Sequence, residues 1–158
     1  MSMLPNHLDR AEALLAPWMD SAERPATNRL DVPLAPTDLL PAVVTLADSG
    51  WGYLIAITGL DPGVATGALT VLYHFAEGAD VVTLRVNVPR ENPEVPTLRG
   101  LIPLAAMYEQ ELNEVLGVAI AGAPESDRLF LPDDWPAGAY PLRKDFHPDQ
   151  IEIARETA

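Results

Sequence analysis

Residues 68–88 read ALTVLYHFAEGADVVTLRVNV and carry the clearest structural pattern in the chain. In residues 68–76, and again in residues 81–88, large apolar side chains occupy every second position, with polar side chains such as Thr70 between them. This period of two residues predicts β-strands with one buried and one wet face, which is typical of antiparallel sheets. Residues 77–80, EGAD, are a short linker rich in turn-forming residues, so the two strands are predicted to pair as a hairpin.

Further helices and strands are predicted on the N-terminal side of this hairpin. Apolar residues at helical spacing predict a helix over residues 7–19 and another over residues 37–47, which begins with Thr37 as its N-cap. A strand is predicted over residues 51–58, and the alternation at residues 29–32 predicts a short edge strand. This mixture of helices and strands favours an α+β fold.

A third helix and a long irregular segment are predicted after the hairpin. Residues 103–116 begin with a proline and end before Gly117, which are typical helix boundaries. Beyond residue 118 glycine and proline are frequent, and scattered aromatic side chains are expected to lie over the domain or over another protein. We therefore expect one α+β domain with a mixed or antiparallel sheet and flanking helices, in which residues 1–121 form the core and residues 122–158 an extended docking arm.

Composition narrows the classes of function. The chain has 158 residues, 23 acidic against 10 basic side chains, a net charge of −13 and no cysteine. Because phosphate backbones attract basic surfaces, this acidic chain is not expected to bind nucleic acid. Without cysteine it cannot form a disulfide, a thiolate zinc site or an iron–sulfur cluster held by its own thiolates.

Membrane-spanning and secretory segments are not expected either. No apolar stretch reaches the roughly 20 residues that cross a bilayer. Residues 1–10 lack the basic region followed by an apolar run that marks a secretory signal. We therefore expect a cytoplasmic protein without direct membrane insertion.

The sequence contains no motif typical of catalysis, cofactor binding or metal ligation. The three histidines, His7, His74 and His147, lie on different predicted elements, and none has a partner at zinc-ligand spacing. No serine lies in a Gly-x-Ser-x-Gly motif, and the glycines match neither of the common phosphate-binding patterns. We therefore expect no catalytic residue, no bound cofactor and no metal site in this chain.

The predicted helix over residues 103–116 carries three glutamates. With about 100° of rotation per residue, Glu109 and Glu111 point about 200° apart, whereas Glu111 and Glu114 lie within about 60° of each other. Glu111 is predicted on the apolar side of the helix, and both Glu111 and Glu114 lie near its C-terminal end, where the helix dipole disfavours negative charge. A cation is therefore expected nearby, either in a partner subunit or, as the spacing favours, in this chain. The candidates in this chain are Arg128, Arg143 and Lys144.

A second cluster of charges lies between aromatic residues further along the chain. Residues 135–146 read WPAGAYPLRKDF, with Arg143, Lys144 and Asp145 flanked by large apolar side chains. This segment is expected to fold back onto the glutamates of the helix, to present a docking strip to another protein, or to do both.

Four separated blocks in the C-terminal half form a further pattern. They read YEQELNEVLGV at residues 108–118, GAP at 122–124, RLFL at 128–131 and PLRKDF at 141–146. Their order and content resemble the 30 kDa subunit family of respiratory complex I, the NADH:quinone oxidoreductase. The family signature reads E-R-E-x-x-D, two apolar residues and G, then G-H-P, then P-L-R-K-D. Gln110, Glu114 and Ala123 depart from this signature.

The resemblance implies an accessory subunit of the hydrophilic arm, on the cytoplasmic side of the membrane, packed against the 49 kDa-type subunit that lines the quinone cavity. Such a subunit holds no cofactor, whereas its parent complex uses iron–sulfur clusters, quinone and NADH. The chain would then support an oxidoreductase without an active site of its own. An ionic frame at the subunit interface is expected from six charged side chains: Glu109, Glu111, Glu114, Arg143, Lys144 and Asp145.

Three alternatives stay open. Residues 133–145 are more like the version of this module found with membrane-bound nickel–iron hydrogenases, so the chain is alternatively the equivalent subunit of such a complex. A free-standing hydrolase would use Glu111 with Glu114 in one pocket, with a raised carboxylate pKa. The third alternative is an acidic binding module without a link to an oxidoreductase.

Overall fold

The computed structural model describes residues 6–149 and residue 151. The α-helices are α1 (His7–Leu15), α2 (Pro36–Asp48) and α3 (Ala105–Leu116), and two 3₁₀ turns are η1 (Ala16–Trp18) and η2 (Val64–Thr66). The strands are β1 (Glu23–Ala26), β2 (Arg29–Leu34), β3 (Tyr53–Leu60), β4 (Ala68–Glu77), β5 (Asp80–Pro89), β6 (Glu94–Pro96) and β7 (Ala119–Ala121).

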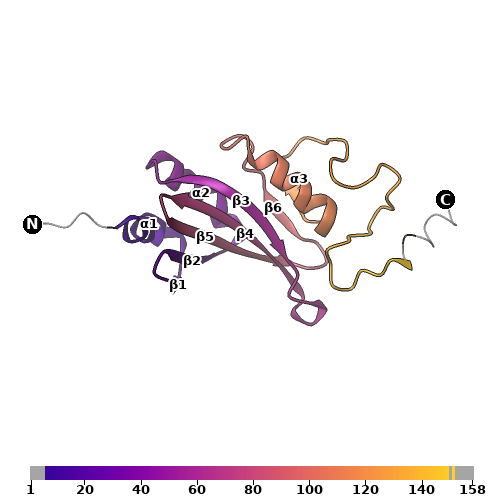
Figure 1. Ribbon diagram of the computed structural model, residues 1–158, viewed down its shortest axis with the longest axis horizontal. Helices are drawn as coiled ribbons and strands as arrows, with labels where there is room; N and C mark the ends of the chain where they lie inside the picture. The colour runs from indigo at the N-terminus through magenta and orange to yellow at the C-terminus, as the bar shows by residue number, and fades with distance from the viewer. Residues whose placement is uncertain (1–5, 150, 152–158) are drawn as a thin grey trace, which may run out of the picture.

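Strands β1 to β5 form a mixed sheet in the order β1-β2-β5-β4-β3 (Figure 1). The hairpin predicted from residues 68–88 is confirmed, because β4 and β5 pair antiparallel from Ala68↔Pro89 to Glu77↔Asp80. β3 adds antiparallel to β4, and β2 adds parallel to β5. Helix α2 makes the crossover from β2 to β3, with the hairpin inserted between these strands, so the predicted α+β fold with a mixed sheet is confirmed.

One predicted strand lies elsewhere in the sheet. The prediction of an edge strand at residues 29–32 is wrong, since β2 lies between β1 and β5 and pairs with both. The edge is formed by β1, all four residues of which are exposed. Its sequence, ERPA, has no alternation of apolar and polar side chains, so periodicity gives no signal for it.

The helices begin and end close to the predicted positions. α2 begins at Pro36 after Ala35, not after the predicted Thr37, because proline fits a first helical position whose N–H needs no partner. α3 begins at Ala105 and ends, as predicted, before Gly117, whose φ of 71° lies in the left-handed region that favours glycine.

Alternate strand residues and the inner sides of the helices share one hydrophobic core. Leu84 and Val86 of β5 and Leu39 of α2 are fully buried in it. Trp51 is buried just before β3, and its Nε1 donates a hydrogen bond to the carbonyl oxygen of His7 at 2.8 Å, which ties α1 to the sheet.

The other face of the central strands carries the predicted polar side chains. Thr70 Oγ1 donates to Asn87 Oδ1 at 2.7 Å, and His74 Nδ1 lies 3.0 Å from Thr83 Oγ1. Thr70 and Thr83 are buried, whereas Asn87 on the same face is exposed. The face is therefore polar in composition but only partly wet.

The two ends of the sheet differ in what covers them. α1 and β1 lie at one end, whereas α3, the small parallel pair of β6 and β7, and the following chain lie at the other (Figure 1). Residues 122–148, the C-terminal segment, contain turns and bends but neither a helix nor a strand, as their composition predicts. The arm predicted over residues 122–158 continues through residues 150 and 152–158, which lie outside the described part of the chain.

Candidate subunit interface

Helix α3 lies directly against the backbone of β3. A Cβ atom at Gly59 would come within 2.1 Å of Leu116 Cδ1 and 2.6 Å of Leu112 Cδ1, so glycine allows this close approach. The hydroxyl of Tyr108 also donates to the carbonyl oxygen of Ile55 at 2.8 Å. These contacts fix the direction in which each glutamate of α3 points.

Glu109 points into the protein and is 1% exposed. Its carboxylate accepts hydrogen bonds from the backbone N–H of Leu98 at 2.6 Å, from Thr97 Oγ1 at 2.8 Å and from Arg99 Nε at 3.0 Å. The negative charge is thus matched by an arginine of the preceding loop. Residues 97–99 and the positive charge of Arg99 are visible in the sequence. However, no rule of residue spacing predicts that they bind Glu109.

Glu114 is also buried, but no cation pairs with it among the described residues. Its Oε1 accepts from Leu129 N at 2.7 Å and from Gln110 Nε2 at 2.8 Å. Its Oε2 accepts from the backbone N–H groups of Phe130 and Leu131, both at 2.8 Å. The expected pairing with Arg128, Arg143 or Lys144 is therefore wrong, because N–H donors of the C-terminal segment satisfy this carboxylate instead.

These hydrogen bonds also change the acidity of Glu114. Burial raises the pKa of the carboxyl group, but the donated bonds from Gln110 and from the three backbone N–H groups outweigh it. The pKa of Glu114 is consequently lowered from its ordinary value. Glu114 is held as an anion that binds a stretch of backbone.

Glu111 is exposed, so its predicted place on the apolar side of α3 is wrong. The inner side of the helix is formed by Glu109, Leu112 and Leu116, which follow the spacing of a buried helix face. Glu111 borders a cavity of about 130 Å³ between α3 and β3, whereas Glu114 borders a different cavity, against Trp135. The two carboxylates therefore do not form the pair that the hydrolase alternative requires.

The C-terminal segment returns to the end of α3 at residues 140–143. Leu142 N donates to the carbonyl oxygen of Val115 at 3.1 Å, and Arg143 Nε donates to that of Leu116 at 2.8 Å. A cation at this position favourably meets the negative end of the helix dipole. The guanidinium of Arg143 also lies 4.7 Å from the ring centroid of Tyr140.

Arg90 anchors the same segment to the end of the sheet. Its guanidinium, which is 8% exposed, forms ion pairs with both Asp61 and Asp145. Asp61 also accepts the backbone N–H of Lys144 at 2.7 Å and that of Gly63 at 2.8 Å. The hydrogen bond from Arg90 lowers the pKa of Asp61 to about 2; burial opposes this effect, and the two backbone N–H groups add to it.

Sequence reasoning did not identify Asp61 and Arg90. Asp61 belongs to the turn-rich stretch after β3, and Arg90 directly follows β5. β3 and β5 run in the same direction on either side of β4, so they finish at the same end of the sheet and bring these two residues together, although 29 positions separate them in the chain.

The six side chains expected at an interface thus divide into two groups. Glu109, Glu114, Arg143 and Asp145 are engaged with their own chain, and among the described residues no ion pair joins any two of the six. Glu111 and Lys144 are exposed. None of these contacts tests a role at a subunit interface, which stays a prediction.

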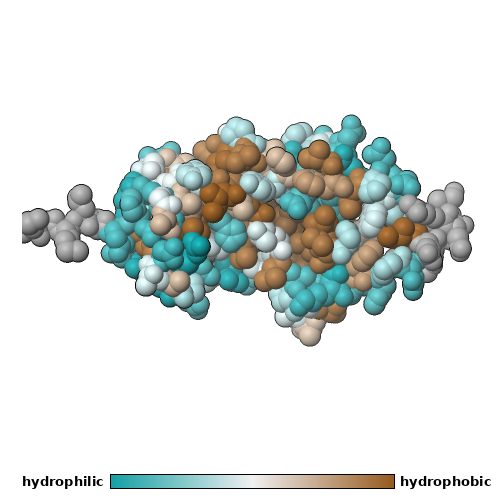
Figure 2. Space-filling view, in the orientation of Figure 1, coloured by the Kyte–Doolittle hydropathy of each residue, from teal (hydrophilic) through white to brown (hydrophobic). Residues whose placement is uncertain are grey.

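Large apolar side chains remain at the surface of this end of the molecule. Leu129 is 62% exposed, Phe130 43% and Leu142 59%. Figure 2 shows small apolar areas among hydrophilic ones there, at the right of the view. The C-terminal segment is therefore attached to the domain while these three apolar side chains stay largely exposed.

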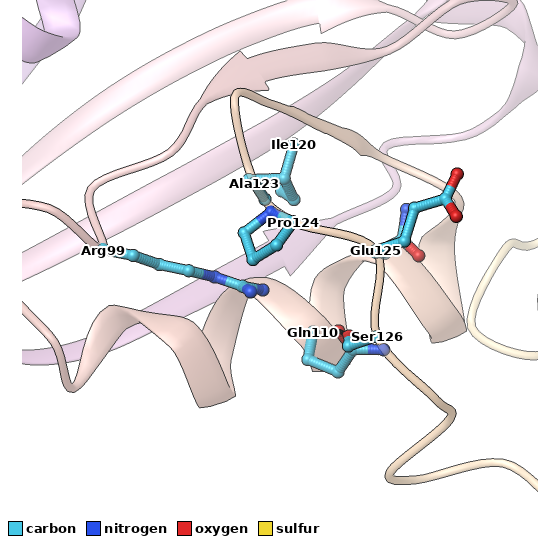
Figure 3. A pocket seen from close by; sticks show the side chains of 8 residues that line it. Arg99, Gln110, Ile120, Ala123, Pro124, Glu125 and Ser126 are labelled. Carbon is cyan, nitrogen blue, oxygen red and sulfur yellow. Dashed lines mark hydrogen bonds between the residues drawn. The ribbon is translucent and has the colours of Figure 1, made fainter.

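A larger cavity, of about 350 Å³, lies beside α3 (Figure 3). Arg99 and Glu125 border it, and so do Gln110 and Ala123, two of the positions that depart from the family signature. The hydroxyl of Ser126 donates to Gln110 Oε1 at 2.6 Å. Within the described part of the chain no three histidine, aspartate or glutamate side chains are grouped to hold a metal ion.

The helices of the described residues are all too short or too polar to cross a membrane.

Comparisons with known proteins identify relatives of this chain. Residues 32–152 match the family model described as "Respiratory-chain NADH dehydrogenase, 30 Kd subunit". The chain is 34% identical over 123 residues to an NADH-quinone oxidoreductase subunit of Moorella thermoacetica, covering 74% of this chain and 81% of that protein. It is 39% identical over 87 residues to membrane-bound hydrogenase subunit beta of Pyrococcus furiosus, covering 54% of this chain and 50% of the relative, so it spans about half the length of that protein.

The fold itself has a close structural counterpart. A chain of the membrane-bound sulfane sulfur reductase, an archaeal respiratory membrane complex, matches with a TM-score of 0.79, covering 98% of this chain and 93% of that chain. The two sequences are 20% identical, so this likeness concerns the fold alone.

Proposed function

Since the chain belongs to the family of the 30 kDa subunit of respiratory-chain NADH dehydrogenase, we propose that it is a non-catalytic subunit of a complex I-type oxidoreductase. In this role it packs against the large 49 kDa-type subunit in the hydrophilic arm and supports electron transfer to quinone. Its place is then peripheral, on the cytoplasmic side of the membrane.

The observation that carries this proposal is the state of the C-terminal segment. Its backbone is bound by Glu114 and Asp61, and the side chain of its Arg143 binds the end of α3, so the entropic cost of ordering it is already met within the chain. Yet Leu129, Phe130 and Leu142 remain 43% to 62% exposed. An ordered segment that keeps three large apolar side chains outward is suited to bury them against another protein.

The six charged residues take two roles in this proposal. Glu111 and Lys144 are exposed and contact the partner directly. Glu109, Glu114, Arg143 and Asp145 hold the surface in shape through their bonds within the chain.

Cofactors belong to other subunits in this proposal. The parent complex uses iron–sulfur clusters, quinone and NADH, and this chain offers no cysteine to hold a cluster. Its contribution is to position the neighbouring redox subunit.

A second candidate is the equivalent subunit of a membrane-bound hydrogenase complex. The identity of 39% to the hydrogenase subunit beta, over a shorter stretch than the match to the Moorella thermoacetica subunit, favours it. In both candidates the chain docks on a larger redox subunit, and they differ in the electron donor and acceptor of the complex.

Purification from the native host tests the proposal. A tagged full-length chain is expected to retain the other subunits of an oxidoreductase complex, and their identity distinguishes the two candidates. The variant Arg143→Glu/Lys144→Glu is expected to lose these subunits and quinone reduction together. Arg29→Glu, a charge reversal on β2, is the control and should retain them. Full assembly and activity of the double variant would refute the proposed interface.

A further inference from the structure

Three consecutive backbone N–H groups converge on one carboxylate in this protein. Leu129 donates to Glu114 Oε1, and Phe130 and Leu131 donate to Oε2, at 2.7 to 2.8 Å. Gln110 supplies a fourth donor at 2.8 Å, so each oxygen accepts two hydrogen bonds. A buried anion with this many donors fixes the backbone of residues 129–131.

Two further hydrogen bonds flank the same stretch. Ser126 Oγ donates to Gln110 Oε1 at 2.6 Å, and Arg128 donates to the carbonyl oxygen of Pro132 at 2.8 Å. Because the backbone N–H groups turn inward to Glu114, the side chains of the first two residues turn outward. Leu129 is 62% exposed and Phe130 43% exposed. We call these two residues the anchor pair.

The anchor pair is flanked in the sequence by negative charge. Four exposed acidic residues lie within five positions of it, with Arg128 as the one basic residue in the stretch. They are Glu125, Asp127, Asp133 and Asp134. An apolar centre with an acidic border complements an apolar pocket with a basic border, and it opposes binding to anionic lipid or nucleic acid.

We propose that Leu129 and Phe130 are the central anchor of the protein–protein interface and insert into an apolar pocket of the partner subunit that is bordered by lysine or arginine. Glu114 is the positioning residue that holds the pair in its docking conformation before the partner arrives. This inference rests on the proposed function and names the surface and the partner chemistry. A pre-ordered anchor lowers the entropic cost of association, and a few central apolar residues typically carry most of the binding energy.

The first experiment compares variants of the tagged full-length chain in the native host. Leu129→Ser/Phe130→Ser is expected to lower the amount of co-purified partner roughly tenfold or more, as for central interface residues. Val64→Ser is the matched control, because it changes an apolar side chain in η2 that is 58% exposed. It should leave the amount of co-purified partner unchanged. In the wild type, added salt is expected to weaken retention of the partner, because the acidic border is screened.

The second experiment separates positioning from folding. Glu114→Gln keeps the size of the side chain but removes the charge and two acceptor sites. Hydrogen exchange of the amides of residues 129–131 is expected to accelerate, while the amides of β4 and β5 stay protected and partner retention falls. Glu114→Asp keeps the negative charge on a shorter side chain, so it should partly restore both the slow exchange of residues 129–131 and the retention of the partner. Unchanged exchange at residues 129–131, or loss of protection in β4 and β5 as well, would contradict a positioning role.

The outcomes also distinguish this inference from the proposed function. If the wild type retains an oxidoreductase complex and Leu129→Ser/Phe130→Ser retains it equally, the anchor is wrong and the proposed function stands. If the wild type retains a partner outside any oxidoreductase complex and the double variant loses it, the anchor stands and the proposed function fails. If the wild type retains no partner at all, both are overturned.

Discussion

The carboxylate of Asp61 accepts a hydrogen bond from the backbone N–H of Lys144 at 2.7 Å, although 83 positions separate the two residues in the chain. The guanidinium of Arg90 forms ion pairs with the same Asp61 and with Asp145, the residue after Lys144. The end of the sheet and the C-terminal segment thus share one charged cluster, which makes the position of the segment dependent on a residue of the core domain.

Replacement of Asp61 by asparagine is expected to destabilise the protein. The variant leaves the buried guanidinium of Arg90 with only the half-exposed Asp145, and loss of one member of a buried ion pair costs about 3 kcal/mol or more. The measurement is the free energy of unfolding in urea. Asp133→Asn changes an exposed carboxylate and serves as the control. Equal stability of the two variants would contradict a structural role of the cluster.

The pH dependence of stability offers a second test of Asp61. Its folded-state pKa of about 2 lies below its ordinary value of 3.8, so the stabilisation is fully present above pH 3.8 and is lost as the pH falls toward 2. Unfolding free energies measured across this window should therefore converge for the wild type and Asp61→Asn. A difference that stays constant down to the lowest pH would refute the assignment. Glu114, whose pKa is also lowered, acts in the same direction below 4.5.

Two glutamates of α3 can be compared on a single helix. Glu109→Gln breaks the buried pair with Arg99 and is expected to lower the free energy of unfolding by about 3 kcal/mol or more. Glu111→Gln replaces an exposed side chain of the same helix and is expected to change the free energy of unfolding by less than about 0.5 kcal/mol. The free energies of unfolding of both variants are measured by thermal and urea unfolding. A larger loss for Glu111→Gln than for Glu109→Gln would contradict the burial of Glu109 and favour the orientation that the apolar spacing predicts.

Gly117 provides a fourth test, at the junction of α3 and the C-terminal segment. Gly117→Ala forces a side chain into the left-handed region, at a cost of about 1 to 2 kcal/mol. It also places a Cβ atom 2.3 Å from the ring of Tyr140, so that ring must move. Gly50→Ala is the matched control, because Gly50 has a φ of 64° after α2 and nothing within 4 Å of the added Cβ. The larger loss of stability is expected for Gly117→Ala.

Much of the fold could be predicted because its core strands are strongly patterned. Residues 68–88 alternate on both arms of the hairpin, and this local period predicts strand pairing without knowledge of distant residues. β1 could not be predicted in the same way, because an exposed edge strand buries nothing that would impose a pattern. When β1 is not predicted, β2 becomes the outermost predicted strand. This explains why residues 29–32 are wrongly predicted as an edge strand.

The candidate interface was predictable only in part, for a different reason. The apolar spacing of α3 suggests an inner side that contains Glu111, but the hydrogen bonds from Leu98 and Thr97 make burial of Glu109 favourable and turn the helix accordingly. Three of the four donors to Glu114 are backbone N–H groups, which every residue except proline carries, so no side-chain pattern indicates them. Gln110, four residues earlier on the helix, is the one donor at a recognisable side-chain spacing. The sequence predicts a cation as the partner of this carboxylate, whereas the structure has the backbone of residues 129–131 in that place.

The connection of Arg90 to Asp145 has a consequence for the order of events while the chain is being synthesised. The hairpin of β4 and β5 closes between residues that leave the ribosome almost together, whereas Asp145 is made 55 residues after Arg90. The strands of the main sheet are therefore synthesised before the C-terminal segment that covers one end of it. The pair of Arg90 with Asp145 can therefore form only after all five strands of the main sheet have been synthesised.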